Sequence, residues 1–82
     1  MLFLAYEETG ELDADVEGPW EDGVLLRPGL LLFDSSASRS AVYHALKHHL
    51  PDGTALLVAP LAAAPKVKGM ADGTTAWLRQ RR

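Results

Sequence analysis

The chain has 82 residues, no cysteine, 48% hydrophobic residues and a formal charge of −3. This length gives room for one small core, and the lack of cysteine excludes disulfides, thiolate metal sites and a cysteine nucleophile. No apolar run approaches the roughly 18 to 20 residues that a membrane span needs, and no basic segment typical of a signal peptide begins the sequence. We therefore expect a single cytoplasmic domain over residues 1–82.

The charges are unevenly distributed. Eight of the eleven acidic residues lie in the first 22 positions, which contain no Lys or Arg, whereas eight basic and three acidic residues follow from Gly23 onward. Either the basic part meets an anion, or the acidic segment is a solvated loop that complements it. Residues 9–22 combine these acids with Gly10, Gly18 and Pro19. This composition predicts a long acidic loop.

Three to four strands are predicted between residues 2 and 59. The apolar run 2–6 predicts a buried strand that ends at Glu7. Runs 23–26 and 30–33 flank Pro28 and Gly29, which favour a type II turn, so these runs form either a hairpin or one interrupted strand. Residues 54–59 are apolar on both faces and predict a strand in the centre of a sheet.

Two helices are predicted, each preceded by a capping residue. The small polar residues 34–38 indicate the start of a helix over about 38–50. Its apolar stripe has helical spacing and comprises Val42, Ala45, Leu46, His49 and Leu50. A second helix is predicted over about 72–80, with Asp72 as its N-cap and with buried contacts from Met70, Trp77 and Leu78.

The order of elements is strand, acidic loop, two strands, helix, strand and helix. It predicts an α+β domain with a ferredoxin-like, split βαβ sheet of three to four strands and two helices packed on one face. Trp20, which lies within the acidic loop, is interpreted as an anchor that holds the loop to the body or to a partner subunit.

Three stretches also carry a family resemblance. They are Ser35–Ser38 opening a helix that closes with His49 and Leu50, Asp52 followed by 55–61, and Gly69–Asp72 followed by Trp77–Arg79. In these stretches the chain resembles the Cas2-like small bacterial proteins of ferredoxin-like fold. The resemblance implies a homodimer and raises nucleic acid as a partner. In the nucleases of that group a metal-binding Asp ends the first strand, whereas this chain has Tyr6, Glu7 and Glu8 there.

Two sets of residues are candidates for binding. Ser35, Ser36, Ser38 and Arg39 lie at a predicted helix N-terminus, where free N–H groups attract a phosphate or carboxylate, although ordinary capping uses the same residues. Lys66, Lys68, Arg79 and Arg81, with Arg82 beside them, are candidates for contacts with the phosphates of a nucleic acid.

Two sets of acidic or histidine residues have the chemistry to bind a metal ion. Glu7, Glu8 and Asp34 would converge on Mg²⁺ if the first and third strands were neighbours, and His44 and His48 are spaced to share a cation. Both sets are explained more simply as ordinary solvent-exposed side chains that bind no metal. We therefore expect no catalytic residue, no metal and no cofactor, and we interpret the protein as a non-enzymatic, dimeric interaction or regulatory module. The alternative is a Cas2-like nucleic-acid-binding protein, with metal-dependent nuclease activity as its extension.

Overall fold

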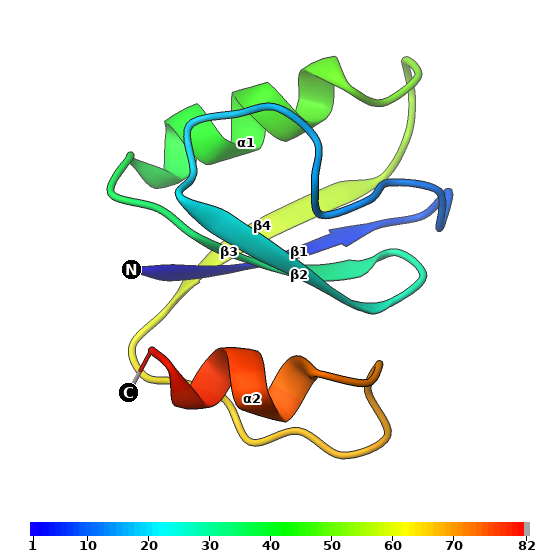
Figure 1. Cartoon of the computed structure of the whole chain (residues 1–82). Helices are drawn as coiled ribbons and strands as arrows, with labels where there is room; N and C mark the ends of the chain where they lie inside the picture. The colour runs from blue at the N-terminus through cyan, green and yellow to red at the C-terminus, as the bar shows by residue number, and fades with distance from the viewer. Residues whose placement is uncertain (82) are drawn as a thin grey trace.

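The computed structural model describes residues 1–81 of the chain (Figure 1). Four strands form one sheet, and two helices accompany it: β1 (Leu2–Glu7), β2 (Asp22–Arg27), β3 (Leu30–Asp34), α1 (Arg39–His48), β4 (Leu56–Leu61) and α2 (Thr74–Arg79). The strand order is β2-β3-β1-β4, and all neighbouring strands are antiparallel. The predicted α+β class is confirmed. Within residues 1–81, no helix is long and apolar enough to cross a membrane.

The two helices lie on opposite faces of the sheet, so the prediction that both pack on one face is wrong (Figure 1). Successive residues of β1 point to alternate faces, and both sets are apolar. Phe3 and Ala5 share a core with Val42 and Leu46 of α1. Leu2 belongs to the second core, which contains Leu78 of α2. A sheet that is apolar on both faces needs a cover on each of them, and one helix supplies each cover.

The strand predicted over 54–59 lies two residues further along and is not central. Residues 56–61 form β4, which pairs only with β1 and is an edge strand. Thr54 precedes it in a turn, where its N–H donates to the carbonyl of Pro51 at 3.2 Å. Pro60 lies within β4, and because proline has no N–H it is suited to an edge position. The central strands are β1 and β3.

The hairpin reading of 23–33 is confirmed, with Pro28 and Gly29 joining β2 to β3. Gly29 has a φ of +82°, a conformation that glycine adopts at little cost. A Cβ atom at this position would lie 2.5 Å from the carbonyl oxygen of Glu7. The Glu7 N–H also donates to the Gly29 carbonyl at 2.9 Å. The turn is therefore pressed against the end of β1.

The acidic segment is a loop that packs on the same face as α1 (Figure 1). Leu12 is buried in the core there, and the ring of Trp20 lies 4.4 Å from that of Phe33. Trp20 Nε1 also donates to the carbonyl of Val16 at 3.0 Å. Trp20 thus anchors the loop to the body, as the sequence predicted.

The start of α1 fits the prediction, whereas the start of α2 does not. Ser38 is the N-cap of α1, and its side chain accepts from the N–H of Ala41. The N-cap of α2 is Gly73, with a φ of +88° and no side-chain hydrogen bond, so the assignment of this role to Asp72 is wrong. His49 was placed in the apolar stripe of α1 but is exposed, and its Nε2 lies 2.7 Å from the carbonyl oxygen of Glu17.

The packing of the hairpin turn can be tested with two matched glycine substitutions. Gly29→Ala and Gly53→Ala both force alanine into a positive φ, at a cost of about 1 to 2 kcal/mol. Only Gly29→Ala also places a methyl group against backbone, because nothing lies within 4 Å of a Cβ at Gly53. We expect urea unfolding to show that Gly29→Ala lowers the free energy of unfolding by at least about 1 kcal/mol more than Gly53→Ala. Equal losses would contradict the close approach.

Candidate functional site

The predicted anion-binding serines are engaged within the chain. Ser35 is buried, and its hydroxyl donates to the Pro19 carbonyl and accepts from the Ala37 N–H. These bonds fasten the end of the acidic loop to the connection between β3 and α1. Ser35, the first residue of the serine-rich segment 35–38, therefore has a structural role.

The other members of that set do not form a common site with Ser35. Ser36 Oγ donates to Oε1 of Glu21 at 3.0 Å, which places a carboxylate where an anion would have to enter. Ser38 caps α1. Arg39 is exposed at the first turn of α1 and lines a hollow with Tyr43 and Val58 instead.

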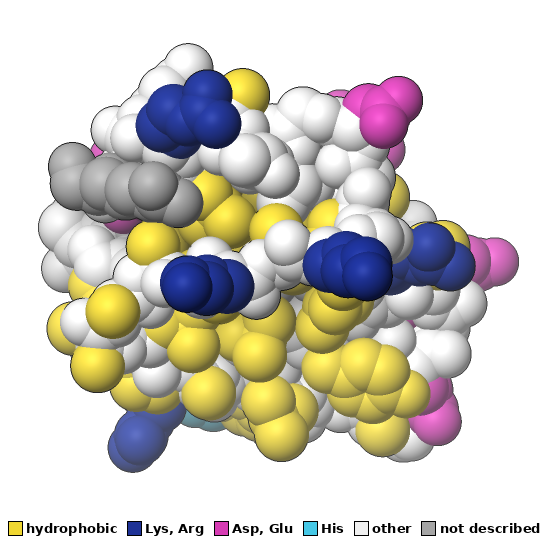
Figure 2. Space-filling view, turned by 90° about the horizontal axis from the view of Figure 1, so that it is seen from below, with side chains coloured by type: hydrophobic (Ala, Val, Ile, Leu, Met, Phe, Trp, Pro, Cys, Tyr) yellow, Lys and Arg dark blue, Asp and Glu magenta, His cyan; other side chains and the backbone are white. Residues whose placement is uncertain are grey.

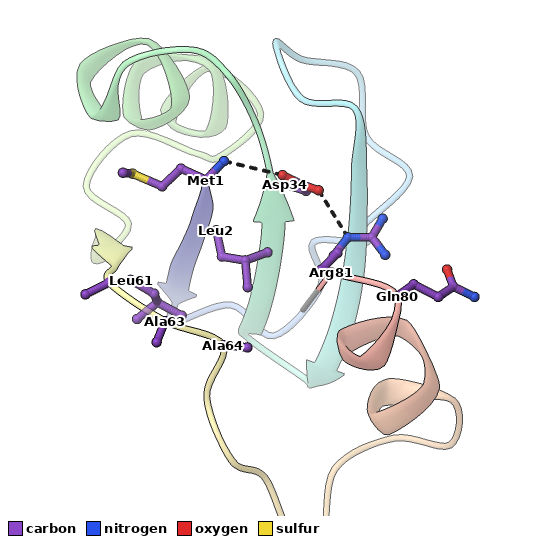
Figure 3. A pocket seen from close by; sticks show the side chains of 9 residues that line it. Met1, Leu2, Asp34, Leu61, Ala63, Ala64, Gln80 and Arg81 are labelled. Carbon is purple, nitrogen blue, oxygen red and sulfur yellow. Dashed lines mark ion pairs between the residues drawn. The ribbon is translucent and has the colours of Figure 1, made fainter.

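The predicted basic cluster is divided by the fold. Arg81 has 14% of its side chain exposed and lies among acidic groups, with Nη2 2.6 Å from Asp22 and Nε 3.2 Å from Asp34 (Figure 3). Its Nη1 donates to the carbonyl of Trp77 at 3.0 Å, and its guanidinium carbon lies 3.7 Å from the centre of the Trp77 ring. The Nε atom is buried and near Asp34 but lacks hydrogen-bond geometry. Arg81 thus ties α2 to β2 and β3, and Arg82 lies outside the described residues.

The pKa of Asp22 is shifted by its hydrogen bonds in this network. Its Oδ1 accepts from the N–H of Gly23 at 2.8 Å, and its Oδ2 accepts from Trp77 Nε1 at 3.1 Å. The Gly23 N–H is the main cause that holds the pKa of Asp22 below its ordinary value of 3.8. Desolvation is the next largest effect and opposes it, and the bonds from Trp77 and Arg81 add to the lowering. The carboxylate is therefore stabilised in its charged form.

A cleft of about 490 Å³ lies beside this network (Figure 3). Small apolar residues, including Leu2, Leu61 and Ala64, line one side, and Asp34, Gln80 and Arg81 line the other. Oδ1 of Asp34 is 3.5 Å from the amino group of Met1, while its Oδ2 faces Arg81. The charges of the cleft are thus paired with one another. Its geometry is that of a junction between the start of β1, the end of β3 and α2.

The remaining predicted basic residues are exposed on the side of α2. They are Lys66, Lys68 and Arg79, and Arg27 accompanies them, with Nη1 donating to the Gly69 carbonyl at 3.3 Å. In the described part of the chain, none of these four forms an ion pair with a carboxylate. Figure 2 shows a row of Lys and Arg side chains across this side, with Asp and Glu only toward its rim.

Beside this basic row lies an apolar sheet surface, which we call the open face: Leu4 and Tyr6 of β1 with Leu57 and Ala59 of β4. Tyr6 is opposite Leu57, and Leu4 is opposite Ala59. Tyr6 is 47% exposed and Leu57 is 52% exposed. Figure 2 shows the broad hydrophobic area that borders the basic row. The six-residue α2 makes its contacts with β2. Leu4 is partly buried against the second core, to which Ala64 and Val67 also belong, whereas Tyr6 and Leu57 remain exposed.

The acidic residues proposed for Mg²⁺ are not brought together. The first and third strands are neighbours, but they are antiparallel, so Asp34 is opposite Leu2 at one end and Glu7 lies at the other. The five residue steps from Leu2 to Glu7 separate these ends by about 17 Å. The buried Glu7 carboxylate instead accepts from the Thr9 hydroxyl and from the N–H of Gly10. Within residues 1–81, no group of three His, Asp or Glu side chains could hold a metal ion.

Comparison with protein-family models, curated proteins and solved structures gives no match. Function has to be inferred from the surfaces of the chain itself. Of the two surfaces described above, the sequence predicted the lysines of the basic row but not the open face. The signal for it was present, because the run 54–59 is apolar at every position except Thr54 and the helix expected to cover the sheet is short.

The contacts of Asp22 predict an acid-sensitive contribution to stability. Because its pKa is lower in the folded chain, the unfolded chain takes up the proton first. The contribution is therefore present above about pH 4 and is lost as the pH falls through the folded pKa. We expect the free energy of unfolding of Asp22→Asn to fall less steeply below about pH 4 than that of the wild type. Thr75→Ala, an exposed change on α2, should keep the wild-type slope, and an unchanged slope in Asp22→Asn would contradict the assignment.

Proposed function

We propose that the protein is a non-enzymatic interaction module that forms a homodimer through the open face. The observation that carries this proposal is the pair Tyr6 and Leu57, which lie side by side on a regular sheet and are about half exposed. Single exposed apolar residues are common on protein surfaces, but contiguous apolar patches mark interaction sites. A flat sheet surface of this kind is suited to packing against its own copy about a two-fold axis.

The size of the chain supports self-association. A domain of 82 residues buries a smaller share of its apolar surface than a larger one does. Covering the open face with a second copy removes apolar surface from water at about 25 cal/mol per Å². The non-enzymatic part of the proposal is supported by the use of Glu7 and Arg81 in local structure, since neither is presented as a free acid or base.

We also propose that the sheet is a variant of the ferredoxin-like arrangement. In support, β3 and β4 run in the same direction, are joined by α1 and have β1 between them, which is a split βαβ unit. The acidic loop between β1 and β2 occupies the same face as α1, where such a sheet would carry its other helix. In this proposal α2 is an addition on the opposite face.

The homodimer is tested by introducing a charge into the open face. Leu57→Asp places a carboxylate at the centre of the proposed contact, where it would be desolvated without a partner. We expect sedimentation equilibrium to show that the dimer dissociation constant rises by at least about tenfold. Because Leu57 is exposed in the single chain, thermal unfolding at low concentration should change little.

The matched control is Ala41→Asp, which introduces the same charge at an exposed position of α1 on the other side of the sheet. It should dimerise like the wild type. A wild-type chain that stays monomeric at millimolar concentration, or a dimer that is equally weakened by both changes, would refute the proposal.

A second candidate function is binding of nucleic acid, in line with the Cas2-like resemblance. The observation that favours it is the set of exposed cations on the α2 side of the sheet: Lys66, Lys68 and Arg79 belong to α2 and the segment before it, and Arg27 donates to Gly69 of that segment. Such a set can contact successive phosphates and gives binding that weakens with salt. In this candidate Arg81 holds α2 in place rather than contacting phosphate.

This candidate predicts a defined salt dependence. We expect Lys66→Ala and Lys68→Ala to lower the slope of log K against log salt for a short DNA duplex by about 1 each. Fluorescence anisotropy of the labelled duplex measures this slope. Arg39→Ala, which removes a charge from α1, serves as the control and should leave the slope unchanged. If the wild type does not bind the duplex at low salt, the candidate is wrong.

A further inference from the structure

The outer edge of β4 carries backbone groups that no strand of the described residues pairs. β4 pairs with β1 alone. The Glu8 N–H donates to the Ala55 carbonyl at 3.2 Å, so the backbone groups of Ala55 and of every second residue after it face β1. By the same alternation, the N–H and C=O groups of Leu56 and Val58 face outward. Pro60 has no N–H to offer and limits the length of this edge.

Two hollows lie along this edge, between β4 and α1. One has a volume of about 240 Å³ and is lined by Arg39, Ser40, Tyr43 and Val58. The other has a volume of about 190 Å³, and its lining includes Tyr43, Lys47 and Leu56. Their strand residues are therefore two positions apart. Side chains on one face of an added strand have the same spacing, about 6.7 Å.

The charge of α1 indicates what such a strand would carry. The helix contains Arg39, Lys47 and the exposed His44 and His48, and it has no acidic residue. Among the residues that line the two hollows, Asp52 is the acidic one, and it lies in the second. Arg39 and Lys47 are eight helical residues apart, about 12 Å. Positions i and i+4 of an extended strand are about 13 Å apart, so acidic side chains with that spacing match both cations.

We propose that the β4 edge binds an extended acidic peptide, which adds to the sheet as a fifth strand with acidic residues at i and i+4 and an apolar residue at i+2 over Tyr43. Backbone bonds to Leu56 and Val58 supply the pairing. The two acidic side chains meet Arg39 in one hollow and Lys47 in the other, and the apolar side chain lies over Tyr43, which lines both. A second copy of the chain fits this edge poorly, because its own Arg39 and Lys47 would meet their equivalents. This binding surface is on the α1 side of the sheet and is separate from the open face.

The test uses a fluorescein-labelled peptide of sequence Thr-Thr-Glu-Thr-Val-Thr-Glu-Thr-Thr, measured by fluorescence anisotropy against the intact chain at low salt. We expect saturable binding. The same peptide with Gln in place of both Glu residues should bind at least about tenfold more weakly, since it loses both charge pairs. A peptide that is N-methylated at the alternate residues whose N–H groups would face β4 should not bind, because it cannot form the backbone hydrogen bonds of the ladder.

Variants of the protein locate the site. The double change Arg39→Glu and Lys47→Glu should abolish binding, whereas Arg79→Glu, the same charge reversal on α2, should leave it unchanged. If the double variant fails to fold, the three peptides compared on the wild type decide the question alone.

The proposal is overturned if the peptide does not bind, if the Gln or N-methylated peptides bind as well as the first, or if Arg79→Glu causes an equal loss. It is also overturned if the chain forms a dimer that Val58→Pro dissociates while the peptide does not bind. That result would assign the edge to a second copy.

Discussion

The apolar character of both faces of the central strands is the constraint on which the architecture depends. β1 alternates between residues that face α1, such as Phe3, and residues that face α2, such as Leu2. Two layers of cover are therefore needed, and a chain of 82 residues has little material for them. On one face α1 and the acidic loop share the task. On the other, a six-residue helix lies against β2, the segment before it adds Ala64, Val67 and Met70 to the cover, and Tyr6 and Leu57 stay exposed.

The short cover on the second face is held by a polar junction as well as by packing. Leu78 supplies the buried apolar contact of α2, and Arg81 fastens the end of the helix to Asp22 and Asp34. Exposed ion pairs contribute little, but Arg81 is largely enclosed and also lies over Trp77. This explains why the basic cluster seen in the sequence does not act as one unit. One of its members stabilises the fold, while the lysines of the preceding loop remain exposed.

The sequence predicted the elements better than their positions in the sheet. Turn and capping chemistry are local, so Pro28 with Gly29 and the N-cap Ser38 could be read directly. Edge or central position is not local: an apolar run with Pro60 next to it was read as a central strand, although that proline was the available sign of an edge. The direction of β1 relative to β3 was equally invisible, and it decides that Glu7 and Asp34 lie at opposite ends. The open face was missed for a related reason, because it is created by what a short helix fails to cover.

The open face and the β4 edge also differ in the kind of contact that they can make. The side of α2 presents apolar sheet beside cations, which is suited to a broad and partly hydrophobic interface. At the β4 edge, by contrast, the contact that we propose uses backbone groups and two cations of α1, so its selectivity would rest on an extended shape and on negative charge. Since Leu57 and Val58 are neighbours whose side chains point to opposite faces, one strand can serve both contacts at once. β4 is an edge strand and exposes Leu57 on one face, and this combination is why both proposed contacts include it.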